Sequence, residues 1–313
     1  MGAALALSER GRGRTWPNPS VGCVLVRDDR ILGRGWTQPG GRPHAEAMAV
    51  AEAGAAARGA TAYITLEPCA APGRGPACVD VLIEAGIARV VVAASDPFPA
   101  VNGKGFARLR DAGITVVTGV RADEAERVMG GFLMRQRKGR PHVTLKLGLS
   151  LDGAISLASG ESRWITGAEA RAHVHLERAR ADAILVGRGT WDADQPILDV
   201  RLRGLETRSP SIVVLSGSNS LGTVPTIKTP GSIADLAADT LLVEGGMRAA
   251  ASFLHGDLVD RLLIYRAPIL IGGGRTLGDI GLDVLPKAHG RWRHLEGRDL
   301  GNDRLDIYER TRD

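Results

Sequence analysis

The residues best suited to chemistry in this 313-residue chain are a histidine and two cysteines in its first half. His44 opens an alanine-rich stretch, Cys69 follows Pro68 at the end of an apolar run, and Cys78 stands nine residues further on. One imidazole and two thiolates offer three metal ligands and leave a fourth position open for water, the arrangement of a catalytic zinc site. Zinc acidifies such a water, so that it can attack an electrophilic carbon near neutral pH.

A carboxylate close to His44 in the sequence could exchange protons with that water. Glu46 follows His44 by two residues, and we expect it to take a proton from the water and pass it to a leaving amine. His-x-Glu followed by Pro-Cys and a second cysteine is the signature of zinc-dependent deaminases. Each residue alone has an ordinary structural explanation, but their order and spacing together favour catalysis. The ligand types favour zinc and leave iron open.

The composition is that of a globular protein and argues against a membrane protein. Hydrophobic residues make up 44% and charged residues 24%, values typical of globular domains. No apolar run reaches the ~18 residues of a membrane helix, and residues 1–20 lack the pattern of a secretion signal, so we expect a cytoplasmic protein without a membrane partner. The net charge of +5 favours anionic ligands, while an aromatic content of 4% argues against a base-stacking surface. The third cysteine, Cys23, lies in a predicted strand and is expected to pack in the core.

Alternating strand and helix patterns predict two α/β domains, 1–140 and 141–313, joined after a basic segment. In the first we expect a hairpin turn over residues 27–30, strands at 21–26, 31–36, 61–66, 89–94 and 114–118, and helices at 44–57, 78–85, 102–112 and 122–137. In the second we expect strands at 142–149, 183–186, 212–215, 241–243, 262–265 and 269–271, and helices at 167–180 and 247–254.

The cysteine spacing separates this chain from common nucleoside deaminases. Those use Pro-Cys-x-x-Cys, whereas position 72 is Pro72 here. With the upstream segment TWPNPSVG at 15–22, the first half resembles the bifunctional deaminase-reductase family of riboflavin biosynthesis. The second half continues the resemblance with LKLGLSLDG at 145–153, GESRWITG at 160–167, DAILVGRGT at 182–190 and LVEGG at 242–246.

The resemblance implies a fold, two reactions and their cofactors. The fold is a three-layer domain similar to cytidine deaminase, followed by a domain similar to dihydrofolate reductase. The first domain would use one zinc ion per chain to hydrolyse the 2-amino group of 2,5-diamino-6-(5-phosphoribosylamino)pyrimidin-4-one. The second would use NADPH to reduce the ribosyl chain to ribityl. The expected partner is this small pyrimidine ribose phosphate and not nucleic acid, and homologues suggest a homo-oligomer.

The resemblance also assigns further site residues by motif. Asn18 and Arg74 are expected to contact the deaminase substrate, since an amide can read a pyrimidine edge and a guanidinium can bind phosphate. Lys146 and Asp194 are the catalytic candidates of the reductase. The ribose phosphate is expected at Ser162, Arg178, Leu198, Arg201 and Glu244. The cofactor is expected at Gly148, Trp164, Thr190, Asp194, Gly246, Met247, Arg248, Ala249, Ala250, Ala251 and Ser252, where glycines at a helix start suit a phosphate.

One loop departs from the family pattern. After Cys69 the chain has Ala70-Ala71-Pro72 where the family usually carries Ser-His-His, whose histidines are expected to touch substrate. One alternative is therefore a reductase with a silenced deaminase domain. Another is a nucleic-acid deaminase with an RNA-binding second domain, against which the cysteine spacing and the scarce aromatics count.

Overall fold

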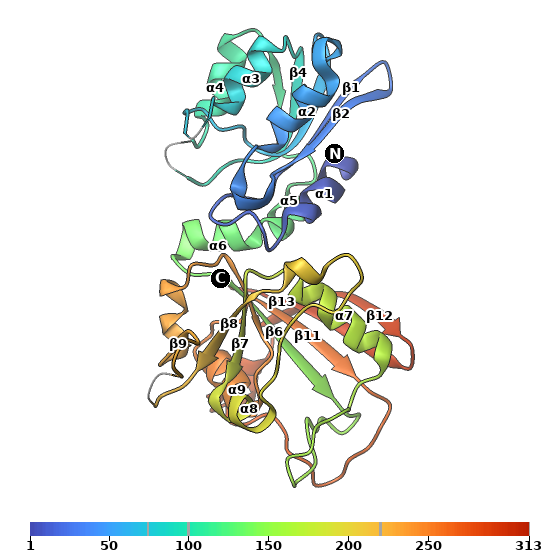
Figure 1. Ribbon diagram of the computed structural model, residues 1–313, viewed down its shortest axis with the longest axis vertical. Helices are drawn as coiled ribbons and strands as arrows, with labels where there is room; N and C mark the ends of the chain where they lie inside the picture. The colour runs from blue at the N-terminus through green and yellow to red at the C-terminus, as the bar shows by residue number, and fades with distance from the viewer. Residues whose placement is uncertain (74, 99–100, 219–220, 313) are drawn as a thin grey trace. The chain divides into compact units, whose positions relative to one another are not determined.

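The computed structural model describes residues 1–73, 75–98, 101–218 and 221–312 (Figure 1). The chain divides into two compact units, Met1–Gly139 and Arg140–Asp313, each built on a β-sheet of its own. Among the described residues, no helix is both long and apolar enough to span a membrane.

The first unit is built on a five-stranded mixed sheet in the order β2-β1-β3-β4-β5. Its strands are β1 (Gly22–Arg27), β2 (Arg30–Trp36), β3 (Thr61–Leu66), β4 (Arg89–Ala94) and β5 (Thr115–Val117). β1 pairs antiparallel with β2 and β3, and β3, β4 and β5 run parallel. The β1–β2 turn has positive φ at Asp28 (51°) and Asp29 (56°), the backbone of a type I′ turn, so the predicted hairpin is confirmed.

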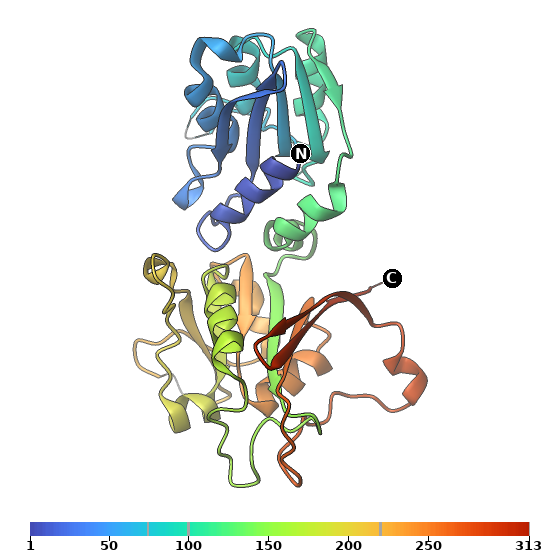
Figure 2. The same ribbon diagram turned by 90° about the vertical axis from the view of Figure 1, so that its right-hand side faces the viewer.

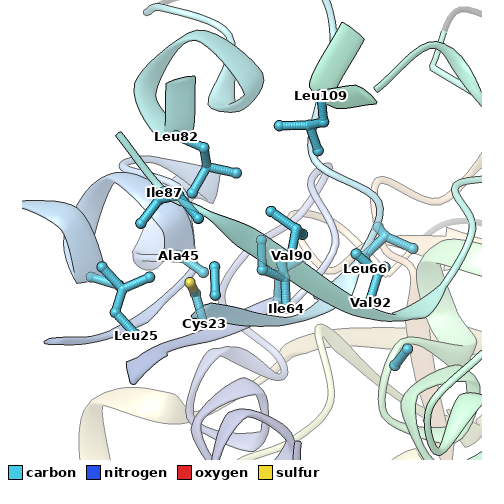
Figure 3. Close-up of a cluster of buried hydrophobic side chains, with 14 of the residues drawn as sticks. Cys23, Leu25, Ala45, Ile64, Leu66, Leu82, Ile87, Val90, Val92 and Leu109 are labelled. Carbon is cyan, nitrogen blue, oxygen red and sulfur yellow. The ribbon is translucent and has the colours of Figure 1, made fainter. Parts of the chain in front are cut away.

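Helices cover both faces of this sheet, which gives the predicted three layers (Figures 1 and 2). The helices are α1 (Gly2–Ser8), α2 (Ala45–Ala53), α3 (Cys78–Glu84), α4 (Lys104–Asp111), α5 (Ala122–Val128) and α6 (Gly130–Lys138). The core between the sheet and α2, α3 and α4 holds Leu25, Ile64 and Leu82 (Figure 3). Cys23 is fully buried among them, which confirms its packing role.

Two predicted helices of this unit differ from the structure. The helix over 122–137 was expected to be continuous, but it breaks at Met129 (φ −95°, ψ 13°) into α5 and α6. Gly130 and Gly131 follow the break, and glycine is a poor helix former. The helix over 44–57 ends early, because Gly54 leaves the helical region (φ 54°) and a short 3-10 turn follows.

The second unit is built on an eight-stranded sheet in the order β12-β13-β11-β6-β10-β7-β8-β9. Its strands are β6 (His142–Leu149), β7 (Ala183–Gly187), β8 (Ser211–Leu215), β9 (Thr226–Ile227), β10 (Thr240–Val243), β11 (Arg261–Arg266), β12 (Trp292–Leu300) and β13 (Asp303–Arg310). The strands from β11 to β9 in this order are parallel, and β13 pairs antiparallel with both β11 and β12.

Helices pack on both faces of this sheet as well. α9 (Met247–His255) packs on the face that carries Leu145 and Leu147, while α7 (Ala168–Arg178) packs on Leu263 and Tyr265 of β11. Because side chains alternate along a strand, Lys146 and Gly148 of β6 lie on the α7 face.

One expectation for this unit is wrong, and two of its elements were not predicted. Residues 269–271 form no strand; they lie in an exposed excursion between β11 and β12. The hairpin of β12 and β13 was not predicted, because its outer strand is charged and exposed along most of its length and shows no alternation. The short helix α8 (Arg188–Asp194) was also missed, since it has no buried residue to produce a periodic pattern.

Candidate functional sites

The three predicted metal ligands come together in the first unit. His44 is the N-cap of α2, Cys69 follows β3, and Cys78 is the first residue of α3. Nδ1 of His44 lies 3.2 Å from Sγ of Cys78 and 3.7 Å from Sγ of Cys69, and the three ligand atoms lie within 4.8 Å of one another. Zinc at about 2.0–2.1 Å from nitrogen and about 2.3 Å from sulfur separates tetrahedral ligands by roughly 3.5 Å. The donor set and its spacing therefore fit zinc.

Hydrogen bonds favour a thiolate at this centre. The backbone N–H of Cys78 donates to Sγ of Cys69 at 3.2 Å. The pKa of Cys69 is lowered to about 4, first by the hydrogen bond from the Cys78 side chain and also by that from His44. The pKa of Cys78 is raised, because its thiol gives a hydrogen bond to Cys69 and because it is buried. The pair thus shares one proton, which metal binding would release.

Glu46 lies in the first turn of α2, with 3% of its surface exposed. Burial raises the pKa of this carboxyl above its ordinary value, although the charge of His44 opposes the shift. A side-chain hydrogen bond links Glu46 to Cys78, so the carboxyl lies beside the metal ligands. A buried carboxyl with a raised pKa is suited to accept a proton and then donate it.

The second unit places a glycine turn at the carboxyl ends of its parallel strands, where ligands bind in open α/β sheets. A Cβ on Gly245 would lie 2.7 Å from the Cβ of Ala249 and 3.2 Å from the backbone nitrogen of Gly187. The N–H of Gly246 donates to Oγ1 of Thr190 at 3.1 Å, which joins α8 to this turn. The first turn of α9 has no acidic residue, so its N-terminus fits a phosphate.

A cavity of about 770 Å³ lies along α9. Residues 230–231 and 276–279 form part of its wall, and so do four predicted cofactor residues, Met247, Arg248, Ala251 and Ser252. Ala249 and Ala250 instead face the core and are almost fully buried. The volume suits a small-molecule ligand, but Lys146, Gly148, Thr190 and Gly246 do not line this cavity.

Arg178 and Glu244 form a buried, two-pronged ion pair. Nε of Arg178 lies 2.7 Å from Oε1 of Glu244, and Nη2 lies 2.9 Å from Oε2. Nη1 donates to the backbone carbonyl of Asp199 at 2.9 Å. The hydrogen bond from Arg178 and the charge of Lys146 lower the pKa of Glu244, although burial opposes them. Lys146 makes no hydrogen bond or ion pair with the residues that the structure describes.

Comparisons with known proteins match both units. Residues 1–94 match the cytidine and deoxycytidylate deaminase zinc-binding region, and residues 141–234 and 227–303 match the RibD C-terminal domain. The riboflavin biosynthesis protein RibD of Escherichia coli is 41% identical, over 97% of this chain and 96% of the relative. That of Aquifex aeolicus is 37% identical, over 99% and 97%. The chain belongs to the RibD family.

Solved RibD structures agree over the whole length. Acinetobacter baumannii RibD has a TM-score of 0.89 and 35% identity, over 99% of this chain and 98% of that one. A diaminohydroxyphosphoribosylaminopyrimidine deaminase/5-amino-6-(5-phosphoribosylamino)uracil reductase from Thermotoga maritima has a TM-score of 0.89 and 30% identity, over 99% and 97%. The chain is thus a bifunctional deaminase and reductase of riboflavin biosynthesis, and the predicted fold class is confirmed. The RNA-binding alternative is wrong, because the second unit matches the RibD C-terminal domain.

Several predicted residues of the RibD reductase unit are exposed. Trp164 is 65% exposed, and the guanidinium of Arg171 lies 4.7 Å from its ring centroid. Asp194 ends α8 and pairs with Arg163 at 3.5 Å. Ser162 and Arg201 are exposed, whereas Leu198 is buried with a positive φ of 55°. Gly148 is half-buried on β6, where a Cβ would lie 3.4 Å from the methyl of Thr166.

In the RibD deaminase unit, Asn18 packs against the loop that leads to His44. A Cβ on Gly41 would overlap Nδ2 of Asn18 at 2.0 Å, and Gly41 has a φ of 85°, so this position requires glycine. The backbone N–H of Asn18 donates to the carbonyl of Thr15 at 2.8 Å and fixes the turn. Arg74 lies outside the described residues, and its substrate contact stays a prediction.

The sequence analysis missed Glu67, which holds the metal-binding loop in place. Its side chain is 3% exposed and accepts four backbone N–H groups. Oε1 accepts from Gly105 at 3.0 Å and Phe106 at 3.3 Å, and Oε2 from Gly103 at 3.1 Å and Asp96 at 3.4 Å. The available signal was an acidic residue between an apolar strand and the Pro-Cys pair.

Proposed function

We propose that the first unit hydrolyses the 2-amino group of 2,5-diamino-6-(5-phosphoribosylamino)pyrimidin-4-one and that the second reduces the deaminated product with NADPH. The observation that carries the proposal is the cluster of His44, Cys69 and Cys78 with buried Glu46 beside it, in one chain with a unit that matches the RibD C-terminal domain. The substrates are those after which the Thermotoga maritima relative is described.

In the deaminase unit, His44, Cys69 and Cys78 would hold zinc, which when bound supplies a Lewis acid that acidifies water. The Glu46 carboxylate accepts a proton from the attacking water and delivers it to the amino nitrogen, which leaves as ammonia. The raised pKa of Glu46 suits it to both transfers. Asn18, fixed in its turn, offers a donor and an acceptor to the pyrimidine edge.

In the reductase unit, NADPH when bound would supply a hydride to the first carbon of the opened ribose. Gly246 and the start of α9 would hold its phosphate, and Gly148, Trp164, Thr190 and residues of α9 would supply its remaining contacts. The ammonium of Lys146 makes no hydrogen bond or ion pair with a described residue, although its charge acts on Glu244, and it would donate a proton to the imine nitrogen. Asp194 lies at the rim of this site.

The ribose phosphate would lie on the same side of the sheet as Lys146. The guanidinium of Arg178 donates two hydrogen bonds to Glu244, so we infer that Arg178 acts mainly by positioning the carboxylate of Glu244 toward the substrate. Arg201 and Ser162 are exposed and would turn toward the phosphate, Arg201 by leaving its ion pair with Asp199, while Leu198 is buried.

A homo-oligomer would cover apolar side chains that the single chain leaves exposed. The excursion between β11 and β12 carries Leu270, which is 76% exposed, and also Val284 and Leu285. Large exposed apolar patches are typical of association surfaces.

The test is one coupled assay on the diaminopyrimidine ribose phosphate, with ammonia release and NADPH oxidation followed together. We expect both signals in the wild type and neither in Glu46→Ala, whose ammonia release falls by about 10²- to 10⁴-fold. Glu46→Ala still consumes NADPH when given the deaminated product. Glu52→Ala, on the exposed side of α2, keeps both rates. If the wild type releases no ammonia but reduces the deaminated product, the altered loop after Cys69 has silenced the deaminase.

A further inference from the structure

Arg42 is a cation near the zinc ligands that has no carboxylate partner among the described residues. It lies two residues before His44, and its half-buried side chain makes no ion pair or side-chain hydrogen bond with any residue the structure describes. Several other arginines of this unit pair with carboxylates. Arg108, which donates to the carbonyl of Ala70, also pairs with Asp80.

The guanidinium of Arg42 lies against the loop that joins the two cysteine ligands. Its Nη2 is 2.9 Å from the point where a Cβ on Gly73 would lie, and its Nη1 is 3.1 Å from the corresponding point on Gly75. A side chain at either glycine would therefore push the guanidinium away. Arg42 thus lies between the segment that carries His44 and the loop that carries Cys69.

Two neighbouring segments lie beside Arg42. Asn18 packs on Gly41, the residue directly before Arg42. The described part of the loop after Cys69, residues 70–73, is Ala-Ala-Pro-Gly and has no polar side chain. Two described guanidinium groups reach this loop: Arg108 is already paired with Asp80, whereas Arg42 has no carboxylate partner among the described residues.

We propose that Arg42 binds the 5′-phosphate of the deaminase substrate and makes the unit prefer the phosphorylated pyrimidine to the free nucleoside. A guanidinium matches a phosphate with two parallel hydrogen bonds, and a half-buried cation gains a counter-charge when the phosphate binds. This inference rests on the substrate proposed above and adds the residue that selects its phosphate.

The test compares ammonia release from the phosphorylated substrate and from its dephosphorylated nucleoside, in Arg42→Gln, Arg42→Lys and the wild type. We expect Arg42→Gln to raise KM for the phosphorylated substrate about 10- to 100-fold, the effect of one charge-assisted contact. The KM for the nucleoside changes less than about twofold, and zinc content stays the same. Arg42→Lys recovers part of the preference, since it keeps the charge and loses the fork.

Arg34→Gln is the matched control, because Arg34 pairs with Glu52 on the surface of the same unit. It should behave as the wild type on both substrates. The assignment of Arg42 to the phosphate would be overturned if Arg42→Gln lowered ammonia release equally with both substrates. It would also be overturned if the variant kept the wild-type preference for the phosphorylated substrate. Failure of the proposed function is a different result, because the wild type would then release ammonia from neither substrate. An unchanged zinc content shows that the deaminase unit of each variant is folded, because its three metal ligands come from separate elements.

Discussion

The two units of this RibD chain build their sites in opposite ways. The deaminase unit holds three ligand atoms within 4.8 Å, on the ends of β3, α2 and α3, with Glu46 buried beside them. The site that we propose for the reductase unit is spread over β6, α7, α8 and the β10–α9 turn, and its Trp164 is 65% exposed. A metal needs side-chain atoms at fixed bond lengths, whereas a dinucleotide is held by backbone amides and an apolar wall. The first site is therefore compact and rigid, and the second is open.

The largest loss of stability should follow from breaking the buried ion pair of Arg178 and Glu244 in the reductase unit. Glu244→Ala leaves the buried guanidinium of Arg178 without its carboxylate, which should cost the second unit about 3–5 kcal/mol of unfolding free energy and abolish reduction. Denaturant unfolding followed with both activities measures this. Glu296→Ala, which breaks an exposed pair with Arg298, should cost less than about 1 kcal/mol. A similar loss in both variants would mean that the buried pair does not organise the site.

In the deaminase unit we expect a smaller change in stability, and there the substitution should stabilise the fold. Asp96 is buried beside Glu67, and desolvation raises its pKa to about 6. Because the folded pKa lies above the ordinary value of 3.8, the ionised carboxyl costs stability that grows between about pH 4 and pH 6 and then stays constant. Asp96→Asn, which can still accept the N–H of Phe98, should stabilise this unit by up to about 2 kcal/mol at pH 7.5 and have no effect near pH 4.

Thermal unfolding of the Asp96 variant at the two pH values provides the measurement. Asp111→Asn, at the exposed end of α4, is the control and should change stability at neither pH. A gain that is the same at pH 4 and pH 7.5 would show that burial of the charge is not its cause.

The sequence predicted the compact site better than the open one. His44, Cys69 and Cys78 were found because metal ligands must follow local spacing rules that survive folding. The β1–β2 hairpin followed from two aspartates that tolerate positive φ.

Other features depend on partners far away in the chain. Glu67 binds N–H groups 29 to 39 residues later, so its role has no local signal. Arg178 was expected at a phosphate, and only the fold shows that its fork is aimed at Glu244, 66 residues later. The charged strand β12 owes its pairing to β13 and not to its own pattern.

The most direct test of the account is removal of zinc, because the two sites should not depend on each other chemically. The protein is treated with a chelator, and ammonia release and reduction of the deaminated product are measured on the same sample before and after one equivalent of zinc is added back. We predict that ammonia release falls to background and returns with zinc, while NADPH oxidation stays unchanged. A loss of both activities, or ammonia release by the metal-free protein, would contradict the account.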